Sequence, residues 1–426
     1  MGLALLLGVF ALCVVIGVPV AFALGIAAVA TFAFEGFPLL LPFQRIMSGI
    51  SVFSLLAIPF FIFAGELMLH GGIAVRLVRL AAAAVGSLRG GLGQVNVFSS
   101  MLFGGISGSA VADVSALGSI LIPVMKDKGY DADYAVNVTV TSSIAGIVIP
   151  PSHNMILYAV AAGGGISVSK LFIAGIVPGI IMSLCLAIAT YLVAVKRGYA
   201  REPFPGWRSM AISFVAAAPG LFTAVIIVGG VLSGIFTVTE SGAIGAIYAL
   251  IVTALAYRSL DWKAFKIAVV NSVRTTSMVM ILVACATAFA YLLALYRVPE
   301  ELTGLLTAIS ENKIVILLIL NLMLLALGMI MDMAALILIC TPIFLPIATN
   351  LGMDPIQFGM VLMMNLGLGL CTPPVGACLF VGCVIGKVRF EQTVKTIWPF
   401  YLAILFALAL TTFVPAISMT LPNLFG

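Results

Sequence analysis

The chain alternates between long apolar segments and short polar breaks from one end to the other. A helix that crosses a bilayer needs about 20 mostly apolar residues, and most of these segments are at least that long. The breaks are rich in charge, proline or glycine. The pattern therefore predicts an all-α polytopic membrane protein with about ten crossings and no soluble domain. The expected spans are 2–33, 50–69, 134–163, 170–195, 211–232, 239–257, 266–296, 356–386 and 394–418.

Two further apolar regions, 92–125 and 312–350, are interrupted by Gly, Ser or Asp near their middles. Basic residues flank the first region, and the positive-inside rule then places both of its ends in the cytoplasm. The same count places both ends of the second region outside. We therefore expect each region to be a re-entrant helical hairpin. The alternative is one tilted helix per region.

Composition strengthens the membrane assignment. Of the 426 residues, 63% are hydrophobic and 8% are charged, whereas soluble domains carry about 25% charged residues. The net charge is +5, and its basic residues concentrate in short connections. They form no basic–aromatic surface, so nucleic-acid binding is not supported, and membrane lipid is the expected surrounding. The seven cysteines are scattered through apolar segments and are expected to be small buried hydrophobes.

Loop charge also predicts the orientation of the chain in a bacterial inner membrane. We expect the N-terminus in the cytoplasm and the C-terminus in the periplasm. The connections near 34–48 and 297–313 are poorer in basic residues and are expected outside.

The two halves of the chain repeat one pattern of proline, glycine and aspartate. At a constant separation of 223 residues, the matched positions are Pro123 and Pro346, Gly129 and Gly352, Asp131 and Asp354, and the pairs Pro150–Pro151 and Pro373–Pro374. Because loop charge gives the copies opposite orientations, we expect the inverted repeats of secondary transporters. The first would be 1–200, with hairpin 92–125 and broken helix 134–163. The second would be 201–426, with hairpin 312–350 and broken helix 356–386.

Each proline pair lies inside an apolar segment and should unwind its helix. Irregular backbone at membrane depth is tolerated where it is buried or lines a cavity. The preceding turn offers free carbonyls suited to a cation such as Na⁺. The following half-helix points its N–H groups at the cavity, which suits a carboxylate. Two discontinuous helices with an ion and substrate site between them are therefore expected.

The most polar stretch at membrane depth runs from Phe103 to Asp113 and contains the hydroxyls of Ser107 and Ser109. The second hairpin offers Gly328 and Asp332. Aspartates inside a membrane are costly and point to function, the alternative being a cap at the hairpin tip. Asp113 lies ten residues before Pro123, and Asp332 lies ten before Pro342, so we matched the two aspartates.

Ser152, His153 and Asn154 follow the first proline pair. The counterparts of the last two are Gly376 and Ala377, so substrate contacts should lean toward the first half. The alternative for His153 is a helix-cap role. The expected substrate-binding residues are Ser107, Ser109, Ser152, His153 and Asn154.

The chain resembles the large membrane subunit of tripartite ATP-independent periplasmic (TRAP) transporters. The resemblance rests on Ala57-Ile-Pro-Phe-Phe-Ile-Phe-Ala-Gly65, the FGGISGSAVAD stretch from Phe103, Ile149-Pro-Pro-Ser152 and Gly367-Leu-Gly-Leu-Cys-Thr-Pro-Pro374. The continuation Ser152-His-Asn-Met155 is similar to sialic-acid members.

The resemblance implies Na⁺-coupled import of an organic acid by an elevator motion. It also implies a small four-helix membrane subunit and a periplasmic binding protein as partners. Family Na⁺ sites at hairpin tips and helix breaks would fall at Ser107, Gly146, Gly328, Gly369 and Thr372. With the polar residues of the hairpins, the expected Na⁺ set is Gly105, Ser107, Asp113, Gly146, Gly328, Asp332, Gly369 and Thr372.

The resulting hypothesis is the permease subunit of a three-part Na⁺ symporter for sialic acid or a C4-dicarboxylate-like acid. One alternative is a stand-alone Na⁺-coupled anion transporter of related architecture. An intramembrane enzyme would need a catalytic dyad or metal set, which the sequence does not present. A channel is disfavoured by the inverted repeat with broken helices.

Overall fold

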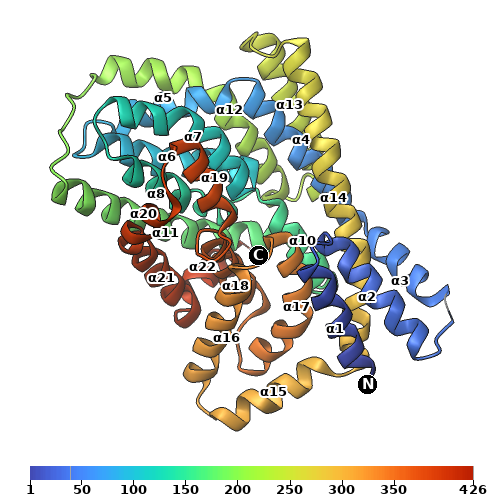
Figure 1. The fold of residues 1–426 in the computed structure, drawn as a ribbon. Coiled ribbons are helices and arrows are strands. Elements are labelled where there is room, and N and C mark those ends of the chain that lie inside the picture. Colours follow the sequence, from blue (N-terminus) through green and yellow to red (C-terminus); the bar gives the residue numbers. More distant parts are fainter. Residues whose placement is uncertain (39, 426) are drawn as a thin grey trace.

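The computed structural model describes residues 1–38 and 40–425, without the side chains of residues 105–107, and it contains no β-strand in that part of the chain. The helices pack into one assembly (Figure 1). Six described helices are long and apolar enough to cross a membrane, or eight if each of two bent pairs counts as one span. The predicted all-α polytopic class is confirmed.

The first part of the chain forms α1 (Gly2–Val15), α2 (Val20–Phe34), α3 (Leu40–Ile50), the short η1 (Phe53–Leu56), α4 (Ala57–His70), α5 (Ile73–Val85), α6 (Gly91–Ser107), α7 (Ala110–Asp127), α8 (Ala132–Ser142), α9 (Ala145–Val148), α10 (His153–Ala161) and α11 (Val168–Lys196). The second part forms α12 (Trp207–Leu232), α13 (Val238–Ile251), η2 (Val252–Ala256), α14 (Trp262–Leu295), α15 (Val298–Ile309), α16 (Lys313–Gly328), α17 (Met333–Asn350), α18 (Pro355–Leu370), α19 (Ala377–Gly386), α20 (Phe390–Thr396), α21 (Trp398–Phe413) and α22 (Ala416–Phe425).

The expected single span 2–33 is wrong, because the chain turns back between α1 and α2. Gly17 has a φ of +86° in this turn, and Pro19 precedes α2. A proline cannot continue the preceding helix, so the apolar run splits into two short helices that pack together. A Cβ on Gly2 would come within 2.0 Å of both Glu35 Oε1 and Tyr296 Oη. Gly2 and Glu35 therefore lie at the same end of the pair. A cytoplasmic position for residue 1 is then incompatible with a position outside for residues 34–48.

Both odd apolar regions are helical hairpins, so the alternative of one tilted helix per region is wrong. Helices α6 and α7 meet at Gly108, whose φ of +62° permits the reversal. Helices α16 and α17 meet at residues 329–332 and also pack against each other.

The two discontinuous helices also form where the proline pairs occur. The α8–α9 segment and α10 meet at an angle of 54°. Helices α18 and α19 are separated by residues 371–376. Both Pro–Pro peptide bonds are cis.

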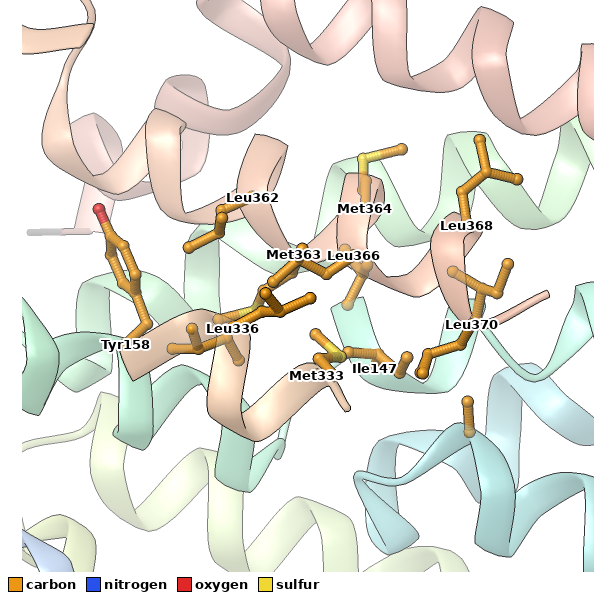
Figure 2. Packing of buried hydrophobic residues seen from close by; sticks show 14 of the residues in the cluster. Ile147, Tyr158, Met333, Leu336, Leu362, Met363, Met364, Leu366, Leu368 and Leu370 are labelled. Carbon is orange, nitrogen blue, oxygen red and sulfur yellow. The ribbon is translucent and has the colours of Figure 1, made fainter. Parts of the chain in front are cut away.

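The packed core joins the two halves of the chain. Figure 2 shows Met363 and Leu366 of α18 beside Leu336 of α17 and Ile147 of α9. All four side chains are at most 1% exposed. The broken helix of the second half is thus buried against the helix break of the first half.

A second group of helices, α4, α13 and α14, packs together and is called the scaffold below. Figure 1 shows α4 and α13 beside the upper part of α14, with α1, α2 and α3 near its lower part. Helix α4 also contacts α6 and α10. The scaffold therefore borders the elements that carry the first hairpin and the first helix break.

Candidate functional site

Glycines bring each hairpin into backbone contact with the broken helix of its own half. A Cβ on Gly146 would lie 2.2 Å from the Cα of Gly104, and a Cβ on Gly369 would lie 2.5 Å from the Cα of Gly328. No side chain fits at such distances. Three of the predicted ion-site glycines, Gly146, Gly328 and Gly369, therefore lie at equivalent contacts.

A polar contact recurs one to two turns away on the same helices. The hydroxyl of Ser142 donates to Asn96 Oδ1 at 3.3 Å, and the amide of Asn365 donates to Asn321 Oδ1 at 2.7 Å. Ser142 and Asn365 are 223 residues apart. Sequence reasoning missed the two partner asparagines, although the repeat spacing could have indicated them.

The hairpin tips also bind the breaks directly. Asn154 donates from Nδ2 to the carbonyl of Gly108 at 2.8 Å. In the second half, the backbone N–H of Val375 donates to the carbonyl of Met329 at 3.2 Å. The amide of Asn154 thus ties α10 to the first hairpin tip. This role differs from the expected substrate contact.

The other predicted substrate residues surround the same tip. Ser109 is the N-cap of α7, where its hydroxyl accepts from the N–H of Ala112 at 3.4 Å. Ser152 is fully buried, and its hydroxyl has no hydrogen-bond partner among the described residues. The ring of His153 packs against Gly108, where a Cβ would come within 2.7 Å of Nδ1. The side chain of Ser107 and the surroundings of Gly105 lie outside the described part.

Asp113 and Asp332 occupy different positions, contrary to the match made on their spacing from proline. Asp332 is the N-cap of α17 and accepts from the N–H of Ala334 at 3.0 Å. Its counterpart at 223 residues is Ser109, the N-cap of α7. Asp113 lies one turn further into α7 and is 1% exposed. Neither of its carboxylate oxygens has a hydrogen-bond partner among the described residues.

The second break presents a hydroxyl and several occupied carbonyls. Thr372 Oγ1 donates to the carbonyl of Leu368 at 2.7 Å, and the Tyr401 hydroxyl donates to the carbonyl of Cys371. The Thr372 oxygen still has lone pairs that could face a cation.

A cavity of about 90 Å³ lies between the scaffold and the first hairpin. We call it the interface cavity. Its walls comprise Ile62, Gly65, Glu66 and Leu69 of α4, Thr275 of α14, Phe103 of α6, Ser109 and Ala112 at the start of α7, and His153 of α10. Two predicted substrate residues, Ser109 and His153, thus face the scaffold. The scaffold residues were missed, because nothing local in the sequence connects them with the hairpin.

Sequence comparisons match residues 7–417 to the family model described as the tripartite ATP-independent periplasmic transporter, DctM component. The C4-dicarboxylate TRAP transporter large permease protein DctM of Rhodobacter capsulatus is 37% identical, covering 96% of each chain. The sialic acid TRAP transporter large permease protein SiaM of Vibrio cholerae is also 37% identical, over 90% of this chain and 89% of that protein.

Among solved structures, the YdaH transporter of Alcanivorax borkumensis superposes with a TM-score of 0.67. Its sequence is 14% identical, and the match covers 89% of each chain. At this identity the likeness supports the fold alone. The family match and the two relatives cover nearly the whole chain, and the chain therefore belongs to the DctM (large permease) component of the TRAP transporters.

Proposed function

We propose that this chain is the permease subunit of a Na⁺-coupled symporter that imports an organic acid delivered by a periplasmic binding protein. The family comprises transporter permeases, not enzymes, and its apolar helices are those of a multi-pass inner-membrane protein. Large permeases of this family work with a small membrane subunit and a binding protein. These are the partners we propose for this chain.

One observation carries the Na⁺ proposal: each hairpin tip lies against the helix break of its own half. The paired glycines allow backbone carbonyls to approach there, and oxygen ligands suit a hard cation. The unpartnered oxygens of Ser152 and Asp113 are buried near the first contact. We propose Gly146, Gly328, Gly369 and Thr372 as Na⁺ ligands. Gly105, Ser107, Asp113 and Asp332 complete the proposed set.

The proposed substrate is an organic acid of the kinds named for the relatives, sialic acid or a C4-dicarboxylate. Its carboxylate would face the first turn of α10, where helix N–H groups favour negative charge. Ser109, Ser152 and His153 border that position.

We further propose an elevator motion of the hairpins and broken helices against the scaffold. The interface cavity of about 90 Å³ is smaller than the roughly 300–1,000 Å³ typical of ligand sites. An organic acid would therefore enter only when the scaffold and the first hairpin move apart. With basic loops in the cytoplasm, the Gly2 end of α1 would lie on the periplasmic side, together with Glu35.

The test is uptake into proteoliposomes containing this chain, its small membrane subunit and the cognate binding protein. Uptake should require an inward Na⁺ gradient and the binding protein. Full uptake without the binding protein would favour the stand-alone transporter instead. Uptake that ignores the Na⁺ gradient would overturn the coupling.

A variant pair sharpens this test at the second break. Thr372→Val should raise the Na⁺ concentration for half-maximal uptake severalfold, because it removes a proposed ligand oxygen. Thr349→Val is the matched control, since Thr349 Oγ1 makes the same bond four residues back, to Leu345 at 3.0 Å, away from both breaks. Equal Na⁺ responses in the two variants would remove Thr372 from the site.

A further inference from the structure

The interface cavity carries an acidic side chain that the proposed Na⁺ sites do not use. Glu66 of α4 lines the cavity together with Ser109 and His153. Its Oε2 accepts a hydrogen bond from Asn271 Nδ2 of α14 at 3.0 Å and lies 3.3 Å from His70 Nε2. Both contacts found among the described residues involve this one oxygen. They hold the carboxylate in place while Oε1 remains able to accept a hydrogen bond from a ligand.

The charge of Glu66 is not balanced inside the cavity. None of the described residues lining it is Lys or Arg, and His70 contacts Glu66 without lining the cavity itself. A second carboxylate brought against Glu66 would meet a like charge in a partly buried place, which is strongly unfavourable. An anionic substrate must therefore turn its carboxylate away from the scaffold.

The opposite wall suits that carboxylate. Helix α10 begins at His153, and its first-turn N–H groups and dipole favour an anion there. The cavity thus has an anion-favouring wall on the hairpin side and an acceptor on the scaffold side. A molecule that fits both carries a carboxylate at one end and hydrogen-bond donors at the other.

We propose that Glu66 is a specificity-determining residue that selects organic acids bearing hydroxyl or ammonium groups opposite their carboxylate, and that it rejects plain dicarboxylates. This inference rests on the proposed function, because it concerns the substrate of the same transport site. It favours a polyhydroxylated acid over a C4-dicarboxylate.

The experiment measures binding to the purified chain in Na⁺ buffer, from the concentration dependence of thermal stabilisation. The probes are sialic acid and gluconate, which are polyhydroxylated monocarboxylates, and succinate, a plain dicarboxylate. In the wild type, the better-bound hydroxylated acid should bind at least about tenfold more tightly than succinate. In Glu66→Gln that ratio should fall to within about threefold, because the repulsion of the second carboxylate is lost.

Two further variants separate charge from misfolding. Glu66→Asp keeps the charge and should keep the preference for the hydroxylated acids. Glu301→Gln removes an exposed carboxylate on α15, far from the cavity lining, and should leave the ratio unchanged. Tighter binding of succinate by the wild type, no binding of either hydroxylated acid, or an unchanged ratio in Glu66→Gln would each overturn the inference. Na⁺-independent uptake would overturn the proposed coupling without altering this binding ratio.

Discussion

Gly146 is a glycine because the backbone of another helix occupies the space a side chain would need. A Cβ there would lie 2.2 Å from Gly104 Cα, and a backbone cannot move aside as a side-chain tip can. Gly146→Ala should therefore destabilise the protein by about 1–3 kcal/mol and lower the thermal unfolding midpoint in detergent. Gly8→Ala on α1 is the control, since a Cβ at Gly8 meets nothing within 4 Å. Equal midpoints for the two variants would show that the close contact is not formed.

At the same scale, sequence reasoning found residues that follow the repeat and missed those that do not. Gly146 and Gly369 were expected from their spacing, and both lie at the contacts described above. The match of Asp113 with Asp332 was wrong, because it was anchored on Pro342 and ignored the constant separation that leads to Ser109. Glu66 was read as an interfacial residue. Its partner Asn271 is 205 residues away in the chain, and no local pattern joins two such positions.

Asp332 serves its helix as a cap whatever else it binds, and a conservative change can separate the two roles. Asp332→Asn retains a side-chain oxygen for the N–H of Ala334 and should keep the unfolding midpoint, since asparagine is an equally good N-cap. Because it removes a charge from the proposed Na⁺ site, it should raise the Na⁺ concentration for half-maximal uptake. Asp332→Ala should do both, with a loss of about 0.5–2 kcal/mol in stability. An unchanged Na⁺ response in Asp332→Asn would restrict Asp332 to capping.

Elements with a strong apolar or proline signal were predicted well, and short helices were not. The hairpins and helix breaks formed where interruptions and proline pairs indicated them. Helices α3 and α15 fall in segments read as loops, because each is short and mixes polar with apolar residues. Such amphipathic helices gain stability from packing on neighbours, which a single sequence does not display. The turn between α1 and α2 was missed because two short apolar helices in succession have the length of one span.

At the scale of the whole molecule, the elevator proposal requires the first hairpin to move relative to the scaffold. Leu69 of α4 and Ala112 of α7 line opposite walls of the interface cavity. In a background without the seven native cysteines, Leu69→Cys with Ala112→Cys should be joined by a short bis-maleimide. The cross-link should abolish uptake, because it fixes the two units together.

The matched control joins two helices proposed to move together. A Cβ on Gly382 of α19 would lie 3.8 Å from Val114 Cγ1 of α7, so Val114→Cys with Gly382→Cys should also cross-link. This link should leave uptake largely intact, since it constrains no motion between hairpin and scaffold. Each single-cysteine variant treated with the same reagent corrects for blockage by the maleimide itself. Equal uptake by the two cross-linked proteins would mean that the hairpin does not travel along the scaffold, and a gate within the hairpin would then have to provide alternating access.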